Sequence, residues 1–314
     1  MTRSAGLDLV RIAGVVAIVA GHALRGWTYP WLFTWHVPVF FVLSGYLWRP
    51  DRSWRDELIR RCRSLLLPYV SWLVVNCLIW FAVVRASGDR FPARTWLKVL
   101  AGGAYLGYPP NAFWFVTALF IAALVMRAAW NLWRPAAWLI GLAGVVWATL
   151  APASVRAVPE AGGIALAGVG LMCLGVALRR WREKLTRPIL AGLVLGLPAW
   201  LIGGFGMVRN VDLKQGELGT PVASVVVSAL ISAGLVLAGD GLDRFIPKPA
   251  HGIVHRLAQA ALPVVLGHCL VLWCLHWAGQ PTTTALAFAL ALALPLAAGL
   301  ALTAAPERLR RLFA

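Results

Sequence analysis

Acidic residues are scarce in this sequence. Only 12 Asp and Glu stand beside 29 Lys and Arg in 314 residues, and charged side chains make up 13% of the chain. A soluble domain of average composition carries about 25% charged residues, which it needs to cover its surface. Because 60% of this chain is apolar, an ordinary soluble enzyme and a disordered protein are both excluded. The composition predicts an all-α, polytopic integral membrane protein.

Cysteine is also scarce, with five in the chain and no Cys-x-x-Cys pair. Four of them lie inside apolar runs, where cysteine commonly serves as a small hydrophobic residue: Cys77, Cys173, Cys269 and Cys274. A disulfide framework and a zinc site are therefore not expected. His251 and His255 have the spacing of ligands on one helical face. They lack an obvious third ligand, so we expect no metal there.

The net charge of +17 does not indicate a nucleic-acid partner, because the basic residues occur in short clusters between apolar runs. This is the distribution that orients membrane proteins, with Lys and Arg kept in the cytoplasm. We expect ten spans of about 20 residues each. They are 6–24, 31–48, 64–84, 112–130, 135–152, 161–178, 187–208, 220–239, 257–277 and 282–304.

Counting basic residues between these segments predicts the topology. With the N-terminus inside, twenty of the 29 Lys and Arg are cytoplasmic and eight are outside. Both ends of the chain are then cytoplasmic, and we expect a multi-pass protein of the cell (plasma or inner) membrane. The 85–111 segment does not follow this distribution, because it places four basic residues outside the cell. We therefore expect either an interfacial helix over 94–106 or a span boundary that lies elsewhere. We expect residues 1–314 to form one domain, with the motifs in 6–120 and further helices in 135–304.

The first apolar segment holds Asp8, Arg11 and His22. An ionisable side chain within a membrane span is costly and usually has a function. Eleven residues of α-helix return to nearly the same direction, so Arg11 and His22 share a face and lie about 16 Å apart along the axis. Asp8 can pair with Arg11. Alternatively, Arg11 reaches the lipid headgroups and His22 is an ordinary polar residue at the outer end.

The second segment contains His36 close to Pro38, and it ends in Ser44-Gly45-Tyr46. Two histidines that converge from neighbouring helices, His22 and His36, could act as a base and its orienting partner. A buried, hydrogen-bonded His in a kinked helix is the alternative. The small residues near Gly45 could equally serve close helix packing.

A basic amphipathic segment follows, with Arg60, Arg61 and Arg63 leading into the next span. Arg offers bidentate contacts to phosphate oxygens, so this cluster could bind a phosphorylated ligand. Arg60 and Arg63 share a helical face. Alternatively, these arginines only set the orientation of the protein in the membrane and contact lipid headgroups.

The spacing Arg11-x10-His22 resembles the hallmark of the acyltransferase-3 family of membrane O-acyltransferases. The run His36-Val-Pro-Val-Phe-Phe-Val-Leu-Ser-Gly-Tyr46 is similar to the second-helix signature of this family, in the form seen in its fucose 4-O-acetylase-like branch. Two further landmarks follow in family order, namely Arg60-x-x-Arg63 before Pro68-Tyr69, and Asn111-Ala-Phe-Trp114-Phe115. His268 stands where family members often carry a late His.

This resemblance implies transfer of an acyl group, usually acetyl, from cytoplasmic acetyl-CoA to a hydroxyl of a carbohydrate or glycosylated product. Acetyl-CoA is then a co-substrate, and no permanently bound cofactor is expected. The implied catalytic residues are His22, Arg11 and His36. The implied CoA-binding residues are Arg11, Arg60, Arg61 and Arg63. The implied substrate contacts are Ser44, Tyr46, Trp114 and His268.

Two other functions remain open from the residues alone. A transporter or flippase for a polar or lipid-linked sugar would use the same intramembrane charges and would move its substrate unmodified. A membrane scaffold would lose only stability when Arg11 or His22 is replaced. Because four motifs occur in family order, we favour the acyltransferase.

Overall fold

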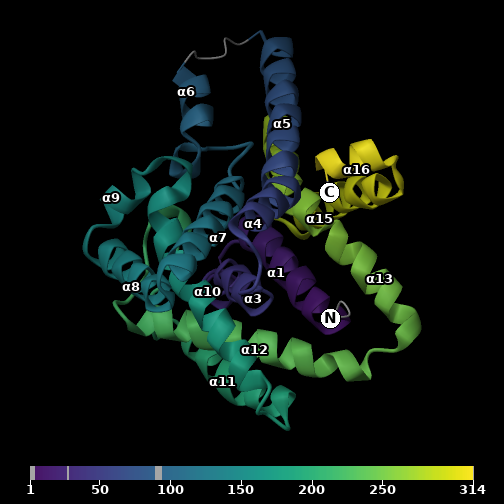
Figure 1. Cartoon of the computed structure of the whole chain (residues 1–314). Coiled ribbons are helices and arrows are strands. Elements are labelled where there is room, and N and C mark those ends of the chain that lie inside the picture. Colours follow the sequence, from purple (N-terminus) through teal and green to yellow (C-terminus); the bar gives the residue numbers. More distant parts are fainter. Residues whose placement is uncertain (1–3, 27, 89–93, 314) are drawn as a thin grey trace.

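The computed structural model describes residues 4–26, 28–88 and 94–313 (Figure 1). Over these ranges the chain forms helices, turns and an isolated antiparallel β-bridge between Asp212 and Glu217. The all-α fold class predicted from composition is confirmed. The α-helices are α1 (Ala5–Ala23), α2 (Tyr29–Leu32), α3 (Pro38–Tyr46), α4 (Trp54–Arg61), α5 (Leu67–Ala86), α6 (Arg94–Ala101), α7 (Trp114–Leu132), α8 (Arg134–Leu150), α9 (Pro152–Arg156), α10 (Gly162–Arg182), α11 (Pro188–Gly204), α12 (Ala223–Leu242), α13 (Lys248–Gln259), α14 (Ala261–Trp277), α15 (Ala285–Ala304) and α16 (Glu307–Phe313). The short turns of other helix types are η1 (Cys62–Leu66), η2 (Gly103–Tyr105), η3 (Pro159–Ala161), η4 (Leu213–Gln215) and η5 (Asp243–Phe245).

Six of the helices in the described ranges are long and apolar enough to cross a membrane. They are α1, the continuous helix Trp54–Ala86, α7, Pro159–Arg182, Ala223–Phe245 and α15. The pair α13 and α14 passes the same test together but is bent by 46°. Helices α8 and α11 are apolar and shorter. Seven of the ten predicted segments overlap a helix or the bent pair that passes this test, and two overlap the shorter helices α8 and α11. The architecture is that of a multi-pass membrane protein.

The predicted span 31–48 is wrong as a single helix. Helix α2 ends at Leu32 and α3 begins at Pro38, with turns between them. Proline has no N–H to donate to a preceding turn and is tolerated at the first helical position, which is why Pro38 begins a new helix rather than continuing one. The nine residues of α3 rise only about 14 Å, too little to cross a membrane alone. In the 94–106 segment a helix is present as α6.

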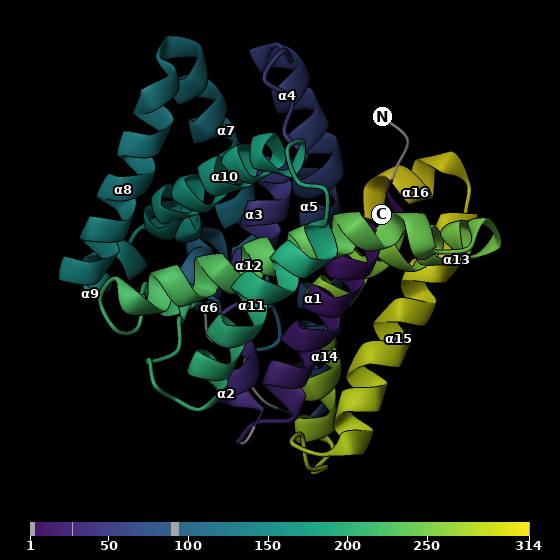
Figure 2. The ribbon, with the colours of Figure 1, turned by 90° about the horizontal axis from the view of Figure 1, so that it is seen from below.

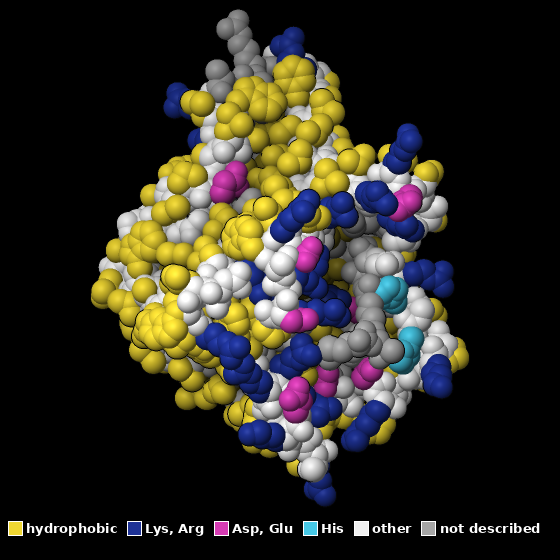
Figure 3. Space-filling model, viewed as in Figure 1, with side chains coloured by type: hydrophobic (Ala, Val, Ile, Leu, Met, Phe, Trp, Pro, Cys, Tyr) yellow, Lys and Arg dark blue, Asp and Glu magenta, His cyan; other side chains and the backbone are white. Residues whose placement is uncertain are grey.

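Helix α1 lies in the middle of the bundle, against α12, α13, α14 and α15. In Figure 2, α4, α16 and the start of α1 lie at one end of the molecule, and α2 lies at the other. Basic side chains gather on the face shown in Figure 3, over α4 and α16, whereas much of the rest of that face is apolar.

Helix α3 packs closely on α10 through glycine. A Cβ at Gly45 would lie 1.9 Å from the carbonyl oxygen of Met172, and one at Gly175 would lie 2.1 Å from the carbonyl oxygen of Val42. No side chain fits at such separations, so the two backbones must be in contact. The packing interpretation of the Ser44–Tyr46 run is therefore confirmed for Gly45.

Candidate functional site

His22 stands in the last turn of α1 and lines a cavity of about 590 Å³. The hydroxyl of Tyr108 lies 3.2 Å from its Nδ1, and the imidazole of His268 lies beside it with ring centroids 5.1 Å apart. Burial raises the pKa of Tyr108, so its hydroxyl stays protonated near neutral pH. The structure therefore places His22 among hydrogen-bonding side chains that hold its ring in one orientation.

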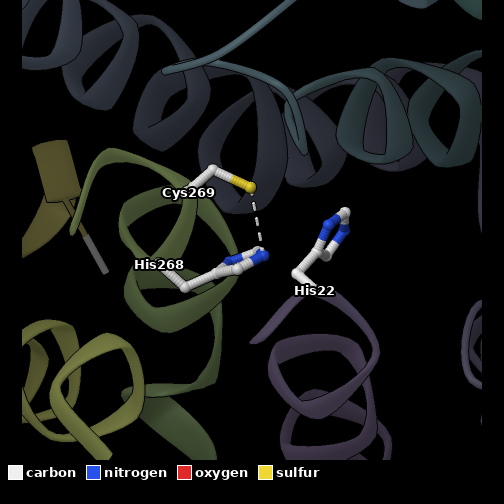
Figure 4. Close-up of side chains that lie close together, drawn as sticks. All are labelled: His22, His268 and Cys269. Atoms are coloured by element: carbon white, nitrogen blue, oxygen red, sulfur yellow. Dashed lines mark hydrogen bonds between the residues drawn. The ribbon is translucent and has the colours of Figure 1, made fainter. Parts of the chain in front are cut away.

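His268 reaches this cluster from α14 and is fully buried. Its Nδ1 lies 3.0 Å from the carbonyl oxygen of Val264. A carbonyl only accepts, so Nδ1 carries the proton and Nε2 is the acceptor. The thiol of Cys269 lies 3.2 Å from that Nε2, as Figure 4 shows, with His22 facing the pair from α1. The structure thus brings together His22 and His268, which are 246 positions apart in the sequence.

Among the described residues, His22, His268 and Cys269 are the group that could hold a metal ion, with one ligand atom each and all within 4.8 Å of one another. Ligands bonded to tetrahedral zinc, one sulfur and one nitrogen, lie about 3.6 Å apart. The Sγ–Nε2 separation of 3.2 Å is shorter and matches a direct thiol–imidazole hydrogen bond. This geometry favours the hydrogen bond over a metal bridge.

His36 lies in the turn between α2 and α3 and lines the same cavity as His22. Its Nδ1 donates to the carbonyl oxygen of Leu32 at 2.9 Å, and its ring lies 4.7 Å from that of Phe33. The two histidines therefore share a cavity, but His268 is the imidazole that packs directly against His22. Trp114 also lines this cavity, at the start of α7.

Lys214 is a residue of this site that the sequence did not reveal. It extends from η4 and donates to the carbonyl oxygen of Leu106 at 2.5 Å and to Oδ1 of Asn111. Burial lowers the pKa of Lys214 from 10.5 to about 8. From the sequence, Lys214 counted only as an outer basic residue, because nothing in a short polar loop indicates that its side chain turns inward.

At the other end of α1, the predicted ion pair between Arg11 and Asp8 is present. Asp8 is buried, and its second oxygen lies 3.3 Å from Nδ1 of His255 on α13. Arg11 lines two further cavities, of about 470 and 380 Å³. Helix α1 therefore presents Arg11 and His22 to separate cavities.

The arginine cluster is organised around Glu57, which is fully buried in α4. Its carboxylate accepts from Arg52 at 2.8 Å, from Arg60 at 2.5 Å and from Arg61 at 2.7 Å. Arg61 also donates to Oγ of Ser44 at 3.0 Å. One buried carboxylate thus holds three guanidinium groups in fixed positions.

Arg60 and Arg61 line the cavity of about 380 Å³ together with Arg11 and Ser44. Arg63 is exposed and is not part of that lining. The π-helical turn η1 begins directly after Arg61 and changes the angular spacing of the residues that follow. Arg63 therefore lies outside the cavity lining that Arg60 and Arg61 share.

The three cavities adjoin one another. Phe115 and Val265 line both the cavity at His22 and the one at Arg60, while Arg11 and Leu47 line both the latter and the cavity of about 470 Å³. Of the predicted substrate contacts, Ser44 and Tyr46 lie at the Arg11 end of this series, and Trp114 lies at the His22 end. The series of neighbouring cavities has arginines at one end and the imidazoles of His22 and His36 at the other.

Comparison with known proteins adds an independent finding. A family model described as "Acyltransferase domain" matches residues 4–304. Nodulation protein NolL of Mesorhizobium japonicum (strain LMG 29417 / CECT 9101 / MAFF 303099) is 24% identical over 174 residues, which cover 50% of this chain and 44% of that protein. The chain thus matches less than half the length of this relative. No solved structure is a significant match.

Proposed function

Because this chain belongs to the acyltransferase family whose model spans residues 4–304, we propose that it transfers an acetyl group from acetyl-CoA to a hydroxyl of a carbohydrate or glycoside. The observation that carries the proposal is the series of adjoining cavities from Arg11, Arg60 and Arg61 to His22. A long donor with an anionic nucleotide at one end and a thioester at the other fits a path of this kind. Acetyl-CoA acts as a co-substrate that is released as CoA.

The donor enters from the cytoplasm in this proposal. The topology predicted from the sequence supports this direction: ten membrane segments, of which 31–48 crosses as the interrupted pair α2 and α3, both ends of the chain inside, and twenty of the 29 Lys and Arg on the cytoplasmic side of the cell membrane. The phosphates of CoA then meet Arg60 and Arg61, which Glu57 holds in place. Arg11, which pairs with Asp8, adds a further guanidinium to the lining of this cavity. The pantetheine arm extends past Phe115 and Val265 toward His22.

His22 is the general base in this account. In this account Nδ1–H of His22 donates a hydrogen bond to the Tyr108 oxygen, so Nε2 is unprotonated and can take the proton from the acceptor hydroxyl. The hydroxyl oxygen attacks the thioester carbonyl, the carbon–sulfur bond breaks, and the imidazolium returns its proton to the departing CoA sulfur. His268 supports the orientation of the His22 ring through direct packing.

The lining of the His22 cavity supports a sugar-like acceptor. Aromatic rings of Tyr29, Phe33 and Trp114 stand beside the polar groups of Asp212 and Gln215. Flat apolar ring faces suit the C–H faces of a sugar, and carboxylate and amide groups suit its hydroxyls. The acceptor therefore occupies the mouth of this cavity, with one hydroxyl directed at His22.

Mass spectrometry of cell-envelope glycans and secreted glycosides, with and without the protein, tests the proposal. We expect one product to gain the mass of an acetyl group only when the intact protein is present. Cells that carry His22→Ala should resemble cells without the protein, whereas His276→Ala, an exposed histidine at the end of α14, should restore the product. Export of an unmodified sugar with no acetylated product would indicate a transporter instead.

A further inference from the structure

The loop between α11 and α12 inserts a lysine into the site, and we propose that Lys214 binds the carbonyl oxygen of the acyl thioester and stabilises the oxyanion that forms there. The inference rests on the proposed acyl transfer and adds a catalytic residue to it. Acyl transfer always places negative charge on this oxygen, and donors directed at it are among the largest contributions to such reactions.

The hydrogen bonds of Lys214 leave room for this role. An ammonium group has three N–H donors. Within the described part of the chain, two of them are taken, by the carbonyl oxygen of Leu106 and by Oδ1 of Asn111. These two acceptors fix the nitrogen at the wall of the cavity that His22 also lines. A donor that is already positioned needs no rearrangement when the oxyanion forms.

The loop itself is built to hold Lys214 in place. Asp212 and Glu217 exchange two backbone hydrogen bonds, of 2.8 and 3.0 Å, and the Asp212 side chain accepts from the backbone N–H of Gln215. Gly216 adopts φ +71°, and a Cβ there would lie 2.8 Å from the carbonyl oxygen of Pro152. Leu213 is buried beside Lys214. The turn is therefore anchored to the rest of the fold on both sides of the lysine.

The charges around Lys214 suit an anionic intermediate. On α14 it faces Cys269, and on its own loop it faces Asp212. Its charge also acts on His22 and adds to that of Arg25 near the end of α1. Tyr108 and Asn111 approach from the segment before α7, and Glu217 stands beside Asp212. Burial raises the pKa of the Asp212 carboxyl group.

Electrons and protons balance in this step. The acceptor oxygen loses its proton to His22 and forms a bond to the thioester carbon, while the C=O π electrons move onto the carbonyl oxygen. Lys214 donates a hydrogen bond to that oxygen and transfers no proton. When the C=O bond re-forms, the carbon–sulfur bond breaks, and the sulfur takes the proton from His22. Lys214 must be charged throughout, so activity should fall as the pH rises through about 8, its pKa.

The test uses purified full-length protein in detergent, acetyl-CoA, and a panel of p-nitrophenyl hexosides, with hydrolysis by water measured for each variant as well. Release of CoA thiol is followed against pH. We expect Lys214→Met to lower kcat by about 10²- to 10³-fold with little change in the KM for acetyl-CoA. Lys214→Arg should be more active than Lys214→Met. Its activity should not fall as the pH rises through about 8, because a guanidinium does not titrate in this range. Lys98→Met, at an exposed lysine of α6, should match the wild type.

Three results would overturn the inference. The first is a kcat of Lys214→Met within threefold of wild type, and the second is an unchanged alkaline fall in Lys214→Arg. The third is failure of both variants to elute as folded protein, which would make Lys214 structural. Absence of acetyl-CoA turnover in the wild type would instead refute the proposed function, so the two failures are distinguishable.

Discussion

Glu57 should contribute far more to stability than an exposed carboxylate with the same kind of partner. Its side chain is fully buried, and it lies 2.7 Å from Arg61, whose side chain is 7% exposed. Glu57→Gln removes the negative charge and leaves the Arg61 guanidinium buried without it. Breaking a buried ion pair in this way costs about 3–5 kcal/mol. In a chain of this size that corresponds to a fall of roughly 4–8 °C in the melting temperature.

The chain offers a matched control in Glu307 and Arg311. Their atoms are 2.5 Å apart, but the side chains are 61% and 71% exposed, and exposed pairs contribute little to stability. Melting in detergent can be followed through the intrinsic fluorescence of the 17 tryptophans. We expect Glu57→Gln to melt clearly below both the wild type and Glu307→Gln. Equal melting temperatures for the two variants would refute the reasoning that Glu57 organises the arginine cluster.

Three other predictions concern catalysis, donor binding and packing. His22→Ala should lower turnover of acetyl-CoA by about 10²- to 10⁴-fold while the protein stays folded, whereas His276→Ala should behave like the wild type; more than a tenth of wild-type turnover in His22→Ala would exclude His22 as the base. Arg60→Ala should raise the KM for acetyl-CoA, and salt should weaken donor binding in the wild type. Arg55→Ala, at an exposed arginine, should have little effect. An unchanged KM in Arg60→Ala would exclude the arginine cluster from donor binding. Gly45→Ala should destabilise the protein by about 1–3 kcal/mol, because α3 and α10 must separate, and an unchanged melting temperature would contradict the close contact between their backbones.

The parts of the site that depend on one helix could be predicted from the sequence. Arg11 and His22 are set by the period of α1, so their shared face and their separation follow from spacing alone. The pairing of Asp8 with Arg11 follows from the same period. The resemblance to a family placed His268 among the substrate contacts, and only the packing of α14 against α1 shows that it lies beside His22.

Other features depend on packing or on local irregularity. The π-helical turn η1, which contains Arg63, is not indicated by any residue pattern. The interruption of 31–48 follows from Pro38, although a proline is also compatible with a kinked continuous helix. Lys214 reaches the site because its loop is anchored through contacts with distant segments. Sequence periodicity contains none of this information.

The central claim is that this protein moves an acetyl group from CoA to a hydroxyl. The most direct measurement supplies acetyl-CoA labelled with ¹³C in the acetyl group to purified full-length protein and the glycoside acceptors, and then locates the label by mass spectrometry. The account predicts that the label appears on one glycoside, in amounts equal to the CoA released, and that His22→Ala abolishes its appearance. Release of CoA without labelled glycoside in any reaction, or equal labelling by His22→Ala, would contradict it.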